Sequence, residues 1–88
     1  MRQHPDFFED LPLVLLYIAK KLKESLALEK LLNEARLDYH IEVDNYVGGL
    51  LFRSERAGAF FYVTEQDFPR AASLLKENRY RPHEQGAD

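Results

Sequence analysis

The side chains best suited to chemistry stand at alternate positions of one short segment, at His40, Glu42 and Asp44. Residues two apart in a β-strand project from the same face, so these three would share one side of a sheet. A His-x-Glu pair could begin a divalent metal site. A third ligand would have to come from His4 or His83, which both stand near an end of the chain. We therefore interpret the segment as a strand with one solvated face, and we expect no metal and no cofactor.

A second candidate site follows, where Gly48 and Gly49 precede Arg53 and Arg56. Glycines can turn successive backbone N–H groups toward an anion, and guanidinium groups add positive charge. These four residues could therefore bind the phosphate or carboxylate of a small anionic effector. A Gly-Gly pair is also common in ordinary turns, so a plain loop is the alternative.

The sequence nominates no catalytic residue. The absence of cysteine removes thiolate nucleophiles, thiolate metal sites and disulfides together. The serines Ser25, Ser54 and Ser73 have no companion base that their spacing identifies. One enzyme hypothesis stays open, a small dimeric α+β barrel that would use His40 in a cleft between subunits.

Composition describes one small folded domain. The chain has 88 residues, of which 45% are hydrophobic and 12% aromatic, and these fractions argue against disorder. Its formal net charge of −3 gives no general attraction to nucleic acid or to an anionic membrane, so we expect neither as a partner. The first residues lack the apolar region and cleavage site of a secretory signal, and we expect a cytoplasmic protein.

Hydrophobic periodicity predicts the elements of the first half. Residues 13–19 are apolar on both alternating faces and predict an interior strand. A helix is predicted over 25–36, with Ser25 or Glu24 as its N-cap. The alternation in 38–44 predicts a strand, and 45–49 a turn or loop. The apolar stripe of the helix would contain Ala27, Leu28, Leu31, Leu32 and Ala35.

The second half repeats the change from strand to helix. Residues 50–53 could form a short strand, 54–58 are predicted to be a hairpin connection, and 59–63 a strand. Thr64 to Asp67 match the spacing of a capping box, so a second helix should follow and end around Asn78. Its buried stripe would contain Phe68, Ala71, Ala72 and Leu75.

This order of elements predicts an α+β fold of the ferredoxin-like type, βαβ(β)βα. Both helices should cover one face of a sheet of three or four mainly antiparallel strands, with the strands 13–19 and 59–63 side by side. The domain would span 13–80, after an irregular lead-in over 1–12 and before a flexible tail over 81–88. A last strand is missing, so one edge of 13–19 needs cover from a chain terminus or from a second subunit.

Aromatic residues suggest a surface for association. Phe52, Phe60 and Tyr62 would lie on the sheet face away from the helices, where exposed apolar groups usually mark an interface. We expect a homo-oligomer or another protein partner there. Aromatics beside arginine on such a sheet also outline an RNA-stacking platform, but the RNA-recognition consensus is absent and the acidic balance opposes it.

Several segments together resemble a known family: the strand Leu13–Ala19, the helical Leu31-Leu32-Asn33-Glu34-Ala35, the strand 38–43 with its Gly pair, and the block 61–75. Over roughly residues 13–77 the chain resembles small bacterial domains described as putative signal-transducing proteins with a PII-like, ferredoxin-like fold. The resemblance implies a regulatory or ligand-sensing role and carries over no catalytic residue. Family members usually have glycine where Arg36 stands. Since no glycine marks the end of the predicted helix in this chain, Arg36 or Leu37 would have to adopt the left-handed conformation that ends it.

The leading hypothesis is therefore a non-enzymatic regulatory or ligand-binding module. The small α+β-barrel enzyme is one alternative. A structural protein-interaction domain without a ligand is the other.

Overall fold

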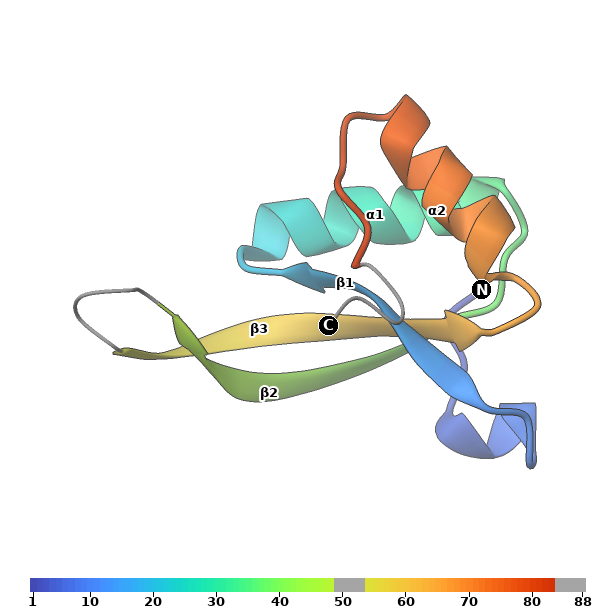
Figure 1. Ribbon diagram of the computed structural model, residues 1–88, viewed down its shortest axis with the longest axis horizontal. Coiled ribbons are helices and arrows are strands. Elements are labelled where there is room, and N and C mark those ends of the chain that lie inside the picture. The colour runs from blue at the N-terminus through green and yellow to red at the C-terminus, as the bar shows by residue number, and fades with distance from the viewer. Residues whose placement is uncertain (49–53, 84–88) are drawn as a thin grey trace.

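A three-stranded antiparallel sheet carries two helices on one face (Figure 1). The structure is a computed structural model that describes residues 1–48 and 54–83. The order of strands is β1-β3-β2, so the last strand in sequence lies in the middle. This arrangement confirms the predicted α+β, ferredoxin-like fold. The elements are η1 (Pro5–Phe8), β1 (Leu13–Ala19), α1 (Leu22–Glu34), β2 (His40–Gly48), β3 (Ser54–Thr64) and α2 (Phe68–Glu77).

The predicted neighbours β1 and β3 do pair, with one irregularity. The register shifts between Leu15 and Tyr17, so Leu16 has no partner in β3. In a regular strand, residues three apart point to opposite faces. Leu16 and Ala19 are nevertheless both buried in the same core, because the extra residue changes the phase of the strand.

The core lies between the sheet and the two helices. Tyr39 and Phe61 are both fully buried there and stack with their ring centroids 5.9 Å apart. A buried core residue gains many small dispersion contacts at once, so these large side chains dominate the packing. The buried residues of this core are Leu16, Ala19, Leu28, Leu32, Leu37, Tyr39, Ile41, Phe61, Val63, Ala71 and Leu75.

The hairpin of β2 and β3 is longer than predicted. The loop expected at 45–49 and the connection expected at 54–58 are wrong where the structure describes them, because 45–48 and 54–58 pair from Asp44↔Gly58 to Gly48↔Ser54. Pairing satisfies the backbone N–H and C=O groups of these residues, and that gain outweighs their polar and glycine-rich composition. The expected strand 50–53 lies outside the described residues. The hairpin therefore projects well past the helices (Figure 1).

The boundaries of α1 also differ from the prediction. The helix begins at Leu22, and its N-cap Lys21 makes no side-chain capping bond, so the proposed caps Ser25 and Glu24 are wrong. The lysine-rich turn is itself a good helix former, which explains the early start. Glu24 instead accepts hydrogen bonds from the backbone N–H of Lys20 at 3.1 Å and from the Tyr17 hydroxyl at 3.0 Å.

Both helices end in the same way, with a left-handed arginine. Arg36 has φ of 58°, which confirms the prediction, and Leu37 N–H donates to the Leu32 carbonyl at 3.0 Å. At the end of α2, Arg79 has φ of 66° and Tyr80 N–H donates to Leu75 at 2.9 Å. Each ending is a Schellman motif, which satisfies carbonyls that the last helical turn leaves open.

The predicted capping box is misplaced. Thr64 Oγ1 accepts from the N–H of Asp67 at 3.2 Å, as expected, but α2 begins at Phe68 with Asp67 as its N-cap. Thr64 therefore closes the turn before the helix and does not cap the helix itself.

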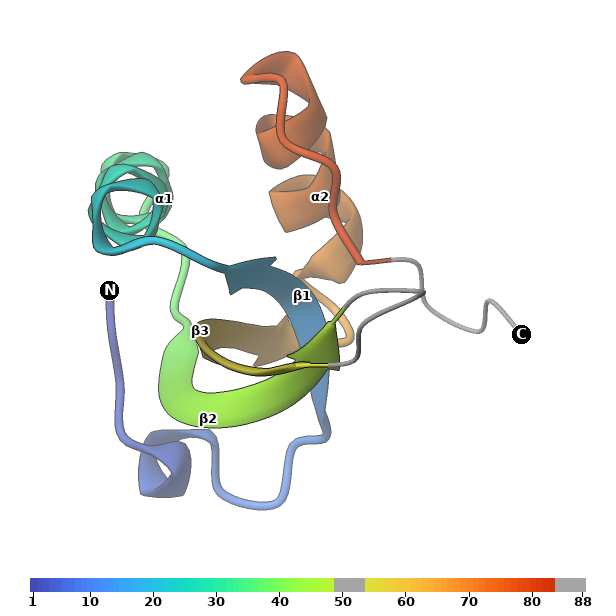
Figure 2. The ribbon, with the colours of Figure 1, turned by 90° about the vertical axis from the view of Figure 1, so that its left-hand side faces the viewer.

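The two terminal segments lie at opposite edges of the sheet. Gln3 N–H donates to the Tyr39 carbonyl at 2.7 Å, and His83 N–H donates to the Leu16 carbonyl at 2.7 Å, at the outer edge of β1. The C-terminal segment thus covers part of the edge that was expected to need cover. The segment η1 lies on the sheet face opposite the helices, and its Phe8 is buried (Figures 1 and 2).

The left-handed arginine makes a testable contribution to stability. A residue with a Cβ destabilises the folded state by roughly 1–2 kcal/mol at such a position, and glycine removes this penalty. Part of the gain is offset, because glycine also raises the conformational entropy of the unfolded chain. We expect Arg36→Gly to raise the free energy of unfolding by about 0.5–1 kcal/mol in urea denaturation. Arg36→Ala is the matched control, since it keeps the positive-φ cost, and an equal gain for both variants would contradict this explanation.

Candidate functional site

The predicted anion site is not assembled in the part of the chain that the structure describes. Gly48 ends β2 and Arg56 lies within β3, so neither stands in a loop there. Gly49 and Arg53 lie outside the described residues, as does Phe52 of the predicted interface. A phosphate or carboxylate site at the tip of the hairpin stays a prediction.

His40 has structural contacts on both ring nitrogens. Its Nδ1 lies 3.0 Å from the Gln3 carbonyl oxygen, and its Nε2 lies 3.3 Å from Oε1 of Glu42. The ring stacks on Tyr62, with centroids 6.2 Å apart. Because the carbonyl can only accept, Nδ1 must carry the hydrogen of that bond. The contact with Gln3 holds the N-terminal segment to the sheet, and Nε2 lies toward the exposed carboxylate of Glu42. Among residues 1–48 and 54–83, no group of three His, Cys, Asp or Glu could hold a metal ion.

The sheet face opposite the helices is aromatic and acidic. Phe60 and Tyr62 are half-buried on β3. Burial raises the pKa of the Tyr62 hydroxyl, and the charges of Glu42 and Asp44 raise it further. The expected interface with a second copy at Phe60 and Tyr62 stays a prediction.

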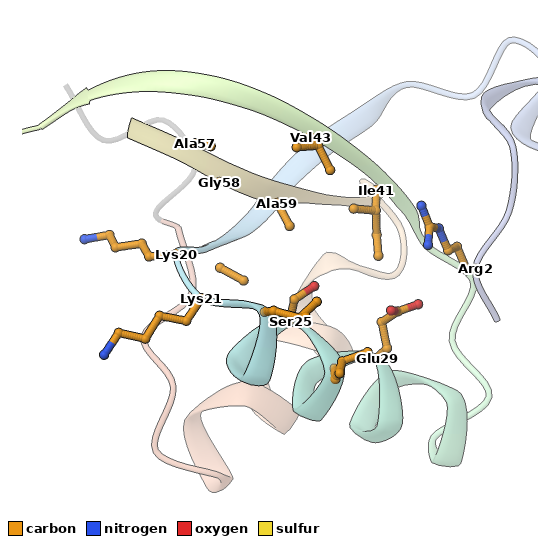
Figure 3. A pocket seen from close by; sticks show the side chains of 13 residues that line it. Arg2, Lys20, Lys21, Ser25, Glu29, Ile41, Val43, Ala57, Gly58 and Ala59 are labelled. Atoms are coloured by element: carbon orange, nitrogen blue, oxygen red, sulfur yellow. The ribbon is translucent and has the colours of Figure 1, made fainter. Parts of the chain in front are cut away.

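A hollow lies on the other face, between α1 and the β2–β3 hairpin. It has a volume of about 350 Å³, and we call it the α1–hairpin groove (Figure 3). It exists because the strands extend beyond the helix that covers them (Figure 1). The groove is lined by Arg2, Ala19, Lys20, Lys21, Leu22, Ser25, Leu26, Glu29, Ile41, Val43, Ala57, Gly58 and Ala59.

The walls of the groove are apolar and unusually open to solvent. Val43 is 76% exposed, Leu22 75% and Leu26 56%. Figure 3 shows Ile41 and Val43 pointing from β2 toward α1. Large apolar groups gathered on one rim differ from scattered surface leucines, because together they offer one continuous surface to a ligand.

Cations stand at both ends of the groove. Lys20 and Lys21 line the end at the start of α1, where their side chains extend outward, and Arg2 and Glu29 line the other end (Figure 3). Glu29 is already engaged, since its Oε1 accepts from the Tyr39 hydroxyl at 3.0 Å. The three cations therefore outnumber the single carboxylate of the lining.

Ser25 supplies a polar group inside this apolar space. The residue is only 8% exposed, and its hydroxyl points from α1 toward β3 (Figure 3). No buried side-chain oxygen or nitrogen of the described residues lacks a hydrogen bond, and none of the described bonds involves this hydroxyl. It must therefore reach solvent through the groove, where it can bond to a ligand.

Sequence reasoning did not find the groove. The helix was predicted to start at Ser25, which left Leu22 outside it, and the hairpin was predicted to be short, which left Ala57 and Gly58 in a loop. The available signal was the pair Leu22 and Leu26, one turn apart and outside the predicted buried stripe.

Comparisons with known proteins give no relative: no family model, no curated protein and no solved structure matches the chain. None of the helices in the described part of the chain is long and apolar enough to cross a membrane.

The tyrosines beside α1 predict a loss of stability in alkali. Burial, together with the bond to Glu24, raises the pKa of Tyr17 to about 12, and burial with the bond to Glu29 raises the pKa of Tyr39 as well. The folded chain thus keeps these protons to higher pH than the unfolded chain, whose tyrosines titrate near about 10. Their contribution is complete below pH about 10 and is lost as the pH rises through the raised values.

We expect the free energy of unfolding of the wild type to fall between pH about 10 and about 12. The double variant Tyr17→Phe/Tyr39→Phe should have a lower free energy of unfolding at neutral pH. Its free energy of unfolding should also fall less steeply over that pH range, because the two titrating hydroxyls are absent. Urea denaturation at a series of pH values measures both slopes. Parallel curves for the two proteins would contradict the assignment.

Proposed function

We propose that the chain is a non-enzymatic, cytoplasmic ligand-binding domain with a regulatory role, and that the α1–hairpin groove takes a small amphipathic anion. One observation carries the proposal: an open apolar groove with three cations at its ends and a single, already engaged carboxylate. Small-molecule sites are usually concave and mostly apolar, with a few polar groups that fix orientation, and a volume of about 350 Å³ is within their usual range.

The lining indicates what such a ligand would contain. An apolar body would lie along Leu26 and Val43, which lose their exposure to water when it binds. A carboxylate or phosphate would lie near Lys21, with Ser25 donating a hydrogen bond from inside the groove. The start of α1 adds to this preference, because the N-terminal end of a helix carries partial positive charge.

The same residues offer little to a chemical step. Among the described residues, no base is hydrogen-bonded to the Ser25 hydroxyl, as a nucleophile would require. His40, the residue of the enzyme hypothesis, does not line the groove, and its ring nitrogens contact Gln3 and Glu42. Binding without catalysis is thus the function that the geometry favours.

Filling the groove should prevent binding. Ala57 is exposed and lines the groove, so Ala57→Trp would occupy the space of the ligand. We expect an amphipathic carboxylate, selected by thermal shift from medium-chain fatty acids and aryl carboxylates, to bind at least about tenfold more weakly to this variant in calorimetry. Ala27→Trp is the matched control, since Ala27 is an exposed residue of α1 outside the groove. Equal losses in both variants would overturn the site, and no shift for any compound would favour a scaffold without a ligand.

The charge of the ligand is tested separately. Lys20→Gln/Lys21→Gln should weaken binding of the carboxylate by about tenfold and leave its neutral amide unchanged, because only the anion interacts with these ammonium groups. Lys30→Gln/Lys76→Gln removes two exposed lysines outside the groove and should change neither affinity. Wild-type protein that binds the acid and the amide equally well would show that the groove selects shape alone.

A further inference from the structure

We infer that the outer edge of β2 binds an extended segment of a partner protein by strand addition, and that the segment alternates basic with apolar residues. The inference concerns the edge of the sheet and does not depend on a ligand in the α1–hairpin groove.

The pairing of Tyr39 shows which backbone groups face outward. Its N–H and C=O bond to Met1 and Gln3, at 3.1 and 2.7 Å, on the side of the chain away from β3. The register between β2 and β3 is regular from His40 to Gly48. In an antiparallel pair, the direction of the backbone groups alternates with each residue. The N–H and C=O groups of Ile41 and Val43 therefore also point outward.

The chain closes both ends of this edge but not its middle. At one end, the N-terminal segment pairs with β2 only at Tyr39. The Gln3 carbonyl also accepts a hydrogen bond from the His40 ring, and the chain then continues into η1. At the other end, the carboxylate of Asp44 accepts the N–H of Asn45 at 2.7 Å. In the described residues, the groups of Ile41 and Val43 between these two points have no further strand beside them.

The side chains on the two faces of the sheet along this open stretch determine which residues suit an added strand. On the face opposite the helices, Glu42 and Asp44 are exposed and negative. Neighbouring residues of an added strand would lie close to them, and lysine or arginine suits that position. On the helix side, Val43 is exposed beside Leu26, so the alternate residues of the partner should be apolar.

The same charges argue against a second copy of the chain. Antiparallel pairing of two β2 edges about Val43 would place Glu42 of one chain opposite Asp44 of the other, twice. Like charges directly opposite each other destabilise a sheet, and natural proteins use charged edge residues to prevent such pairing. A basic partner removes that conflict.

The test uses short capped peptides with a fluorescent label, measured by anisotropy. We expect a peptide that alternates lysine and valine to bind. Three control peptides should each bind at least about tenfold more weakly. The first alternates glutamate with valine, the second has its lysines in one block and its valines in another, and the third is the alternating lysine–valine peptide with N-methyl groups along one edge. Equal binding of the alternating and blocked basic peptides would overturn the inference, because it would show attraction by charge alone.

Two variants separate the backbone from the charges. Val43→Pro removes an outward N–H without touching the pairing with β3, a position where an edge strand tolerates proline, and it should abolish binding while the fold is retained. Glu42→Gln/Asp44→Asn should weaken binding by about tenfold, with Glu65→Gln/Glu77→Gln as an exposed control pair that has no effect. The amide signals of Ile41 and Val43 should gain protection from hydrogen exchange when the peptide binds.

Unchanged binding by Val43→Pro, in a variant that circular dichroism shows to be folded, would overturn strand addition. Concentration-dependent self-association without peptide, removed by Val43→Pro, would overturn the choice of partner in favour of a second copy.

Discussion

Tyr39 connects three parts of the molecule that are distant in sequence. Its ring is fully buried and stacks on Phe61 of the central strand. Its hydroxyl donates to Glu29 and lies 3.1 Å from Oδ1 of Asn33, so α1 is held over the sheet. Its backbone pairs with Met1 and Gln3. A buried hydroxyl without a partner would cost free energy, so the position of α1 and the burial of this ring depend on each other.

The position of α1 in turn produces the candidate site. The helix covers the sheet where Tyr39 and Ile41 are buried, but the hairpin continues past it to Val43 and beyond. The uncovered part of the helix-facing surface becomes the α1–hairpin groove. The apolar residues on its rim are therefore exposed because the β2–β3 hairpin extends further than α1.

The sequence was sufficient for the parts of the fold that depend on local patterns. The change from alternating to helical periodicity at residues 13–37 and 59–77 predicts the order of elements, and the absence of glycine after α1 predicts a left-handed residue, which is Arg36. The length of the hairpin could not be predicted in this way. Residues 45–48 and 54–58 have the composition of a turn, and only the pairing of each with the other makes them strands.

The candidate site was beyond sequence reasoning for a related reason. Its lining comes from the N-terminal segment, α1 and three strands, and no local pattern brings these together. Ser25 shows the difficulty well. As a residue at the expected start of a helix it suggested a cap, whereas its actual place one turn later puts its hydroxyl inside the groove.

The unpaired Leu16 also determines how β1 can vary. The strand contains one residue more than its partner, and that residue exchanges the inner and outer faces on either side of it. The carbonyl at this point also receives the N–H of His83. Deletion of Leu16 alone would leave 13–15 opposite 62–64 and 17–19 opposite 59–61, so every other residue of β1 would keep its partner and its face. One residue can therefore be lost at this point without a change of register elsewhere in the strand, although the core would lose the buried side chain of Leu16.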